Sequence, residues 1–199
     1  MTFLSRNGSL VAFEDYATKS SVIVVYTGQG KGKTSASLGL LGRGLGTDWT
    51  CAFVQFIKYW RVGEHDFLDA LGDVYGQQLV FHKGGRGFFN AGDISEKGIT
   101  HQQHLRAARN TYDFAYGAAT SGDYQLIICD EINNAFHDGL LGKKQLKALL
   151  TDKHEQTNLC LTGRNFPKEL YKHVDIATDM KKIKHHFDDK YLANRGVDY

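Results

Sequence analysis

The fold is decided by residues 21–46, which read SVIVVYTGQGKGKTSASLGLLGRGLG. The run of branched apolar residues at 22–25 predicts a strand that is buried on both faces of a sheet. A glycine-rich stretch follows at 27–34, and Leu38, Leu41 and Leu45 then repeat at the spacing of one helix face. The sequence therefore predicts a strand, a tight loop and a helix, in that order.

The loop has the composition of a phosphate-binding loop. In such loops the backbone N–H groups and the helix N-terminus hold phosphate oxygens, a lysine reaches the distal phosphates, and a hydroxyl ligates magnesium. The usual pattern has a glycine five residues before Gly32, where this chain has Thr27, so we expect a loop that is one residue tighter. The residues expected to bind phosphate are Gly28, Gln29, Gly30, Lys31, Gly32, Lys33 and Thr34.

Length and charge limit the classes of protein to which the chain can belong. Its 199 residues fit one domain with a substantial core. The formal net charge of +2 favours neither a nucleic-acid partner nor a membrane-surface partner. No apolar run approaches the roughly 20 residues of a membrane helix, and the first residues lack the layout of a signal peptide.

The cysteines indicate a reducing compartment. Cys51, Cys129 and Cys160 each lie in an apolar run, and no two of them have the spacing of a zinc site. We expect all three to be buried and reduced. Reduced thiols without an export signal predict a cytoplasmic protein.

Strands and helices alternate along the rest of the chain. Residues 1–20 are expected to form an arm or a short helix, and residues 21–199 a single nucleotide-binding domain. We expect further strands at 50–57, 79–82, 126–129, 158–162 and 175–178, and helices at 64–71, 94–120, 144–150 and 167–173. This order predicts an α/β fold with a mostly parallel sheet, helices on both faces, and ligands at the carboxyl ends of the strands.

Charged residues follow several of these strands. Asp130 and Glu131 end an apolar strand, and one of these carboxylates with Thr34 and waters would hold magnesium. Arg164 follows another strand and suits a bidentate contact with phosphate, although a solvated arginine remains the alternative. Arg43, on the first helix, fits either the nucleotide pocket or the plain surface.

Other residues are less informative. His101 and His104 are three residues apart on the long predicted helix, a spacing compatible with a metal, but we interpret them as ordinary residues of the helix surface. The basic run at 181–186 has no interleaved aromatic residues and predicts a solvated face. Phe88 and Phe89 lie in a glycine-rich loop, which is unusual because burial normally claims paired aromatic residues.

Taken together, these motifs resemble those of the CobA/BtuR-type ATP:corrinoid adenosyltransferases. The loop at 28–34 is similar to the shortened Gly-Asn-Gly-Lys-Gly-Lys-Thr loop of that family. Similar motifs follow in the same order at 56–58 with 63–64, at 130–133, at 161–165 with 167–170, and from 184 to 199. The resemblance runs from about residue 21 to the last residue.

The resemblance implies a RecA-like P-loop domain that forms a homodimer. It also implies transfer of the 5′-deoxyadenosyl group of ATP to the cobalt(I) of a corrinoid, with release of triphosphate and with electrons from a flavoprotein or other reductase. By position, Lys33 and the loop amides would bind triphosphate, Thr34 with Glu131 would hold Mg²⁺ or Mn²⁺, and Arg43 and Arg164 would line the nucleotide pocket. Lys33, Glu131 and Arg164 are the residues that we expect to act in catalysis.

One departure from the family concerns the corrinoid. Where the family usually has Gly-Phe-Thr-Trp, this chain has Gly87-Phe88-Phe89-Asn90. In the family the phenylalanine and the tryptophan press on the lower face of the corrin and make cobalt(II) reducible. Phe88, Phe89 and Asn90 are therefore the expected corrinoid-binding residues, with Phe89 or Trp60 as a possible substitute for the tryptophan.

Two other functions fit parts of the same sequence. A different phosphate-loop ATPase or kinase would release orthophosphate or ADP instead of triphosphate. A non-catalytic relative would bind ATP or a corrinoid tightly without turnover.

Overall fold

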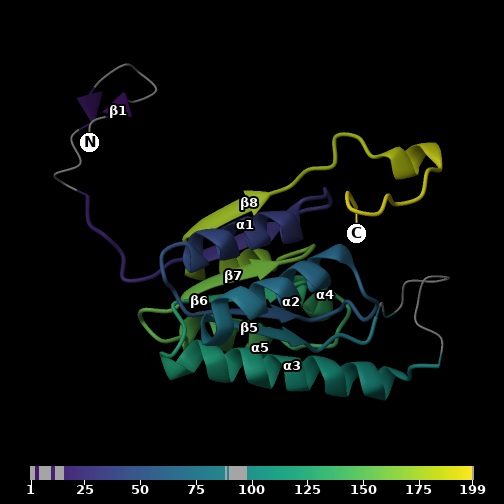
Figure 1. The fold of residues 1–199 in the computed structure, drawn as a ribbon, viewed down its shortest axis with the longest axis horizontal. Helices are drawn as coiled ribbons and strands as arrows, with labels where there is room; N and C mark the ends of the chain where they lie inside the picture. The colour runs from purple at the N-terminus through teal and green to yellow at the C-terminus, as the bar shows by residue number, and fades with distance from the viewer. Residues whose placement is uncertain (1–2, 5–9, 12–15, 88, 90–97, 199) are drawn as a thin grey trace.

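The structure is a computed structural model that describes residues 3–4, 10–11, 16–87, 89 and 98–198 (Figure 1). Its centre is a six-stranded sheet in the order β5-β4-β6-β7-β3-β8, in which every pair of neighbours is parallel. The strands are β3 (Ile23–Thr27), β4 (Cys51–Gln55), β5 (Leu79–Lys83), β6 (Leu126–Asp130), β7 (Asn158–Thr162) and β8 (Ile176–Asp179). The predicted α/β fold with a parallel sheet is confirmed, and β7 separates the phosphate-loop strand β3 from the acidic strand β6.

Helices cover both faces of this sheet (Figure 1). The α-helices are α1 (Lys33–Leu45), α2 (Gly63–Tyr75), α3 (His101–Ser121), α4 (Ile132–His137) and α5 (Lys143–Thr151). The short 3₁₀ helices among the described residues are η1 (Gly76–Gln78), η3 (Lys168–His173) and η4 (His186–Asp189). Because side chains alternate along a strand, Val24 of β3 belongs to the core to which α1 and α2 contribute, and Val25 to the opposite core, to which α3, α4 and α5 contribute. Both cores exclude water, which agrees with the fully apolar strand sequences.

The described part of the N-terminal arm differs from the short helix that was one of the two expectations. It forms a small antiparallel hairpin in which β1 (Phe3–Leu4) pairs with β2 (Leu10–Val11). Lys19 then forms an ion pair with Asp175 just before β8, and this contact joins the end of the arm to the sheet edge.

Several predicted element limits were wrong. The long helix was expected from residue 94 but begins at His101, because Thr100 caps it: the Thr100 hydroxyl accepts from the Gln103 N–H at 3.3 Å, and Gln103 Oε1 accepts from the Thr100 N–H at 2.7 Å. The stretch after Pro167 is a 3₁₀ helix. The six-residue helix α4 was not predicted, because it is too short to show a period.

Two predictions about single residue types had different outcomes. The prediction of buried, reduced cysteines is confirmed, since all three are free and buried. The interpretation of His104 as a surface residue was wrong, because its side chain is only 4% exposed, whereas His101 is exposed. Among the described helices, none combines the length and apolar character needed to cross a membrane.

Candidate active site

The phosphate loop connects the end of β3 to the start of α1. Gly28 and Gly32 both have φ of 102°, a left-handed region that glycine enters freely and other residues rarely do. Gly32 immediately precedes the helix, and Lys33 and Thr34 form its first turn. The predicted loop residues therefore lie together at the N-terminus of α1, where backbone N–H groups lack intrahelical partners and the helix dipole favours an anion.

Lys33 folds back across this loop. Its ammonium donates to the carbonyl of Gly28 at 2.9 Å and to that of Gly30 at 2.6 Å. Burial lowers the pKa of Lys33, and the positive charge of Arg164 lowers it further. The ammonium is thus held in a site where positive charge is unfavourable, and an anion in the loop would relieve both effects.

The chain after β8 lies against the same loop. Gly30 N–H donates to the Met180 carbonyl at 2.6 Å, and Met180 N–H donates to the Thr27 carbonyl at 2.8 Å. A Cβ on Gly28 would overlap the Asp179 carboxylate, and one on Gly30 would lie 2.7 Å from the Met180 carbonyl oxygen. These two glycines are therefore needed for the close approach of the segment at 179–181, in addition to any role with phosphate.

Asp130, at the end of β6, is buried and accepts hydrogen bonds from side chains of α1, β7 and β4. Its carboxylate accepts from the hydroxyl of Thr34 at 3.0 Å, from the hydroxyl of Thr162 at 2.7 Å and from the amide of Gln55 at 3.1 Å. The carboxylate is 0% exposed. It therefore fixes the first turn of α1 relative to β4, β6 and β7, and places Thr34 beside a negative charge.

Gln55 links this carboxylate to a second buried polar residue. Its Oε1 accepts from Nε2 of His65 at 2.5 Å, while His65 Nδ1 lies 3.4 Å from both the Val62 N–H and the ammonium of Lys83. Gln55 is 0% exposed and His65 3% exposed. Because donors surround Nδ1, the ring must be neutral with its proton on Nε2. The hydrogen bonds then run without a break from His65 through Gln55 to Asp130.

Glu131 has the properties of a cation ligand. Its φ is 61°, its N–H donates to Thr162 Oγ1 at 2.9 Å, and its buried Oε2 has no hydrogen-bond partner among the described residues. Burial, and then the charge of Asp130, raise the pKa of Glu131 to about 7, although Lys58 acts in the opposite direction. Two adjacent acids, of which Asp130 accepts from the Thr34 hydroxyl and Glu131 has an unpartnered oxygen, fit a divalent cation.

Lys58 balances part of this negative charge. It forms an ion pair with Glu64 at the start of α2. Burial alone would lower the pKa of Lys58, but the charges of Asp130, Glu131 and Glu64 hold it above its ordinary value. Lys58 therefore stays charged beside the acidic pair.

The remaining predicted residues are less closely associated with the loop. Arg164 follows β7, is exposed, and is held through its N–H, which donates to Asn134 Oδ1 at 2.7 Å. Arg43 is exposed in the last turn of α1, about 15 Å along the helix axis from Lys33. Within one chain the structure does not bring Arg43 to the loop, so its role stays a prediction.

The expected corrinoid-binding residues lie after β5. Phe88 and Asn90 fall outside the described residues. Phe89 is half-buried, and its ring stacks on that of His101 at 4.6 Å between centroids and contacts that of His104 at 5.4 Å. The helix α3 therefore contacts Phe89 through both histidines.

Gln55, Thr162 and His65 are the site residues that sequence reasoning missed. A signal existed for the first two, because each is a polar residue at the carboxyl end of an otherwise apolar strand. His65 had no such signal, since its partner lies ten residues earlier on another element.

The buried histidine predicts a pH dependence of stability. Burial, and then the charge of Lys83, lower the pKa of His65, while Glu64 acts in the opposite direction. The unfolded chain takes up this proton near pH 6.5 and the folded protein only at lower pH, so protonation favours unfolding below about pH 6.5. The variant His65→Gln has no group that titrates at this position. When the pH is lowered from about 7.5 to 5.5, its free energy of unfolding, measured by denaturant titration, should fall less than that of the wild type. Equal losses in the two proteins would contradict the neutral, buried ring.

Comparisons with known proteins agree with the motifs. A family model described as ATP:corrinoid adenosyltransferase BtuR/CobO/CobP matches residues 19–199. A corrinoid adenosyltransferase of Sinorhizobium sp is 29% identical over 188 residues, which cover 92% of this chain and 84% of that protein. One of Escherichia coli (strain K12) is 26% identical over 179 residues, covering 89% of this chain and 85% of that protein.

A solved structure, that of the flagellar accessory protein FlaH from Methanocaldococcus jannaschii, aligns with a TM-score of 0.48 at 10% identity, over 81% of this chain and 71% of its own. Because the family model extends from residue 19 to the last residue, its match includes the phosphate loop, the acidic pair and the closing segment. The chain belongs to the ATP:corrinoid adenosyltransferase family.

Proposed function

We propose that the protein transfers the 5′-deoxyadenosyl group of ATP to the cobalt of a cobalt(I) corrinoid and releases triphosphate, in the synthesis or salvage of adenosylcobalamin. Membership of the family and its similarity to several corrinoid adenosyltransferases support this activity. The observation that carries the proposal is the hydrogen bond of Thr34 to Asp130, which joins a phosphate-binding helix N-terminus to an acidic pair.

The reaction is a displacement at the 5′-carbon of ATP. The cobalt(I) electron pair forms the cobalt–carbon bond, the bond from that carbon to the triphosphate oxygen breaks, and triphosphate leaves with the electron pair of that bond. No proton has to be removed from the nucleophile, so no general base is needed. Alignment of the reactants can lower the barrier by roughly 7–11 kcal/mol, which exceeds the effect of a typical general acid or base.

The residues of this chain then have distinct roles. Lys33 and the loop N–H groups at 28–34, other than the Gly30 N–H that donates to Met180, hold the triphosphate. Arg164 adds a guanidinium that stabilises the departing charge. Thr34 and Glu131, with Asp130 behind them, would hold Mg²⁺ or Mn²⁺, which supplies further positive charge at the phosphates when bound. Phe88, Phe89 and Asn90 would contact the corrinoid.

We also infer the compartment, the oligomeric state and the source of electrons. We expect a cytoplasmic homodimer that receives electrons from a flavoprotein or another reductase, because cobalt(I) is too strongly reducing to persist without one. Neither nucleic acid nor a membrane is expected as a partner. Reduced, buried cysteines agree with a reducing compartment.

The test is direct. The protein is incubated in the dark with ATP, magnesium and chemically reduced cobalamin, and in parallel with reduced cobinamide. We expect the light-sensitive spectrum of a cobalt–carbon product in at least one of the two reactions. Absence of this product with both corrinoids would reject the proposed function.

Asn90 predicts that one substitution changes the rate of adenosylation differently when the reaction starts from cobalt(II) and when it starts from cobalt(I). If the aromatic platform is incomplete because of Asn90, then Asn90→Trp should speed adenosylation that starts from cobalt(II) under a weak reductant, by about tenfold or more, since 1.4 kcal/mol in the reduction step is a factor of ten. The reaction from preformed cobalt(I) should change less than about twofold. Equal acceleration from both starting states would contradict a role of this position in reduction.

A further inference from the structure

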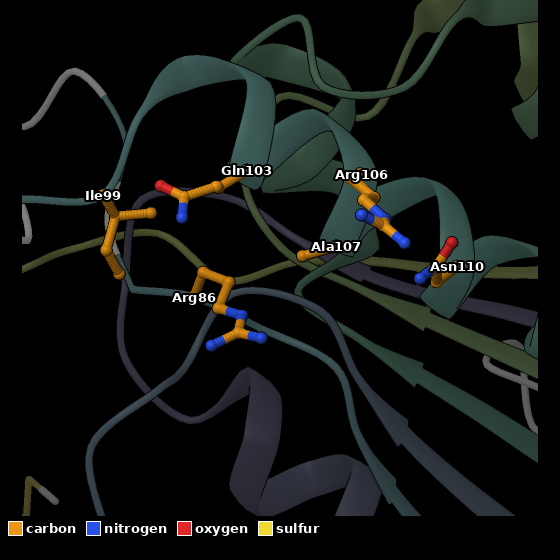
Figure 2. Close-up of a pocket in the computed structure, with 6 residues that line it drawn as sticks. All are labelled: Arg86, Ile99, Gln103, Arg106, Ala107 and Asn110. Atoms are coloured by element: carbon orange, nitrogen blue, oxygen red, sulfur yellow. The ribbon is translucent and has the colours of Figure 1, made fainter.

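A polar groove lies between α3 and the loop that follows β5. One cavity of about 370 Å³ is lined by Arg86, Ile99, Gln103, Arg106, Ala107 and Asn110 (Figure 2). A second cavity of about 460 Å³ shares Arg86, Ala107 and Asn110 with the first, and extends to Tyr59 and Lys83. The shared residues make the two cavities neighbouring parts of one groove at the β5 edge of the sheet.

The described lining of this groove is basic and rich in hydrogen-bond donors. It contains the guanidinium groups of Arg86 and Arg106 and the amides of Gln103 and Asn110, and no acidic residue. Lys83 adds a third positive charge in the neighbouring cavity. Guanidinium groups on two walls, together with amide donors, favour an anionic ligand such as a phosphate or phosphodiester over a neutral ligand.

Within the described residues, the donors of the two arginines have no protein partner. Arg61 pairs with Asp66 and Asp69, whereas no ion pair or side-chain hydrogen bond of Arg86 or Arg106 occurs in that part of the chain. Both side chains are exposed, and they come from opposite walls of the groove (Figure 2). Among these residues nothing competes with an anion for the five N–H donors of each guanidinium.

Both walls of the groove are held in place by the backbone. Gly84 N–H donates to the Gln55 carbonyl at 3.0 Å, and Gly87 N–H donates to the Ile57 carbonyl at 2.8 Å, so the residues on both sides of Arg86 are fixed to the end of β4. A Cβ on Gly85 would lie 2.6 Å from the Lys58 carbonyl oxygen, which shows how closely this loop packs. The opposite wall is one face of α3, with Gln103, Arg106 and Asn110 at helical spacing.

The helix that forms one wall also contacts an aromatic residue expected at the corrinoid. Phe89, three residues after Arg86, stacks on His101 of α3. A corrinoid placed against Phe89 would therefore have its periphery next to the groove. The periphery of cobalamin bears a nucleotide loop with one anionic phosphodiester, and cobinamide lacks this group.

We propose that Arg86 and Arg106 bind the phosphodiester of the nucleotide loop of the corrinoid, and so make the protein prefer complete corrinoids to cobinamide. This inference rests on the proposed function. Gln103 and Asn110 complete the subsite as neutral donors. The two arginines act on binding and not on the chemical step, because the phosphodiester takes no part in the displacement at the 5′-carbon.

The test compares two corrinoids in matched variants. Arg86→Gln and Arg106→Gln remove one guanidinium each, and Arg109→Gln is the control, since Arg109 is an exposed residue of α3 that does not line either cavity. Dissociation constants for hydroxocobalamin and for dicyanocobinamide are measured by quenching of tryptophan fluorescence, and far-UV circular dichroism verifies the fold of each variant. Steady-state adenosylation of reduced cobalamin and cobinamide is measured in parallel.

We expect Arg86→Gln and Arg106→Gln to weaken cobalamin binding about tenfold or more, as the loss of a charge-assisted hydrogen bond does, while cobinamide binding changes less than about twofold. The weakening should appear in KM for cobalamin, with kcat and KM for ATP unchanged. Arg109→Gln should resemble the wild type with both corrinoids.

Three results would overturn the inference: equal weakening for both corrinoids, no weakening for either, or a rise in KM for ATP, which would assign the arginines to the nucleotide. Adenosylation of cobinamide by the wild type tests the proposed function separately, because cobinamide has no group for this subsite. The binding measurements decide the inference even in the absence of turnover.

Discussion

Lys33→Ala should reduce kcat/KM for ATP by roughly 10²–10³-fold, the effect of removing one donor to developing negative charge. The Lys33 ammonium lies inside the phosphate loop, on the carbonyls of Gly28 and Gly30. Burial lowers its pKa, so this charge is unfavourable until an anion binds. The free energy of unfolding should therefore change little, while activity falls strongly. Steady-state kinetics and denaturant titration of the same variant measure the two quantities.

Lys147→Ala is the matched control for this prediction. Lys147 is an exposed lysine of α5, and within the described residues its side chain forms no hydrogen bond or ion pair. We expect this variant to keep the activity of the wild type. Activity of Lys33→Ala within a few-fold of the wild type would show that the triphosphate does not bind in this loop.

Asp130→Asn should lower both stability and activity. The carboxylate accepts from Thr34, Thr162 and Gln55 in a fully buried position. An amide offers one acceptor oxygen, so at least one buried donor loses its partner, at a cost of roughly 1–3 kcal/mol in the free energy of unfolding. Loss of the charge beside the Thr34 hydroxyl should also reduce kcat/KM by about 10²-fold and raise the concentration of divalent cation needed for half-maximal rate.

The same substitution at an exposed site is the control for this effect. Asp123 lies in the turn between α3 and β6 and is exposed. Among the described residues its carboxylate has no partner, and its backbone N–H donates to the Ser121 hydroxyl. Asp123→Asn should leave the midpoint of unfolding and the cation dependence unchanged. If Asp130→Asn were equally harmless, the account of Asp130 as the acceptor that orients Thr34 would be wrong.

The sequence was sufficient for the parts of the fold that local patterns specify. Apolar runs identified the strands of the six-stranded sheet, and the glycines at 28, 30 and 32 identified the phosphate loop. The strand β6 was predicted from its apolar run at 126–129 but extends one residue further, because the buried Asp130 carboxylate has hydrogen-bond donors as partners. These features depend on residues that are neighbours in the chain.

The contacts that complete the site could not be predicted in this way. Asp130 meets Gln55 and Thr162 only because β4, β6 and β7 are adjacent in the sheet, and strand order is not encoded in any local pattern. The packing of residues 179–181 on Gly28 and Gly30 depends on β8 pairing with β3. His104 was misassigned because its burial depends on packing against other elements, which no local pattern shows.

The central claim is that ATP lies with its triphosphate in the loop at 28–34, so that its 5′-carbon is the site of attack. Phosphorus NMR of the products formed from ATP and reduced cobalamin tests this most directly. The account predicts one intact triphosphate for each cobalt–carbon bond formed. ADP or orthophosphate as the first phosphorus product would contradict it, because attack would then have occurred at a phosphorus atom and not at carbon.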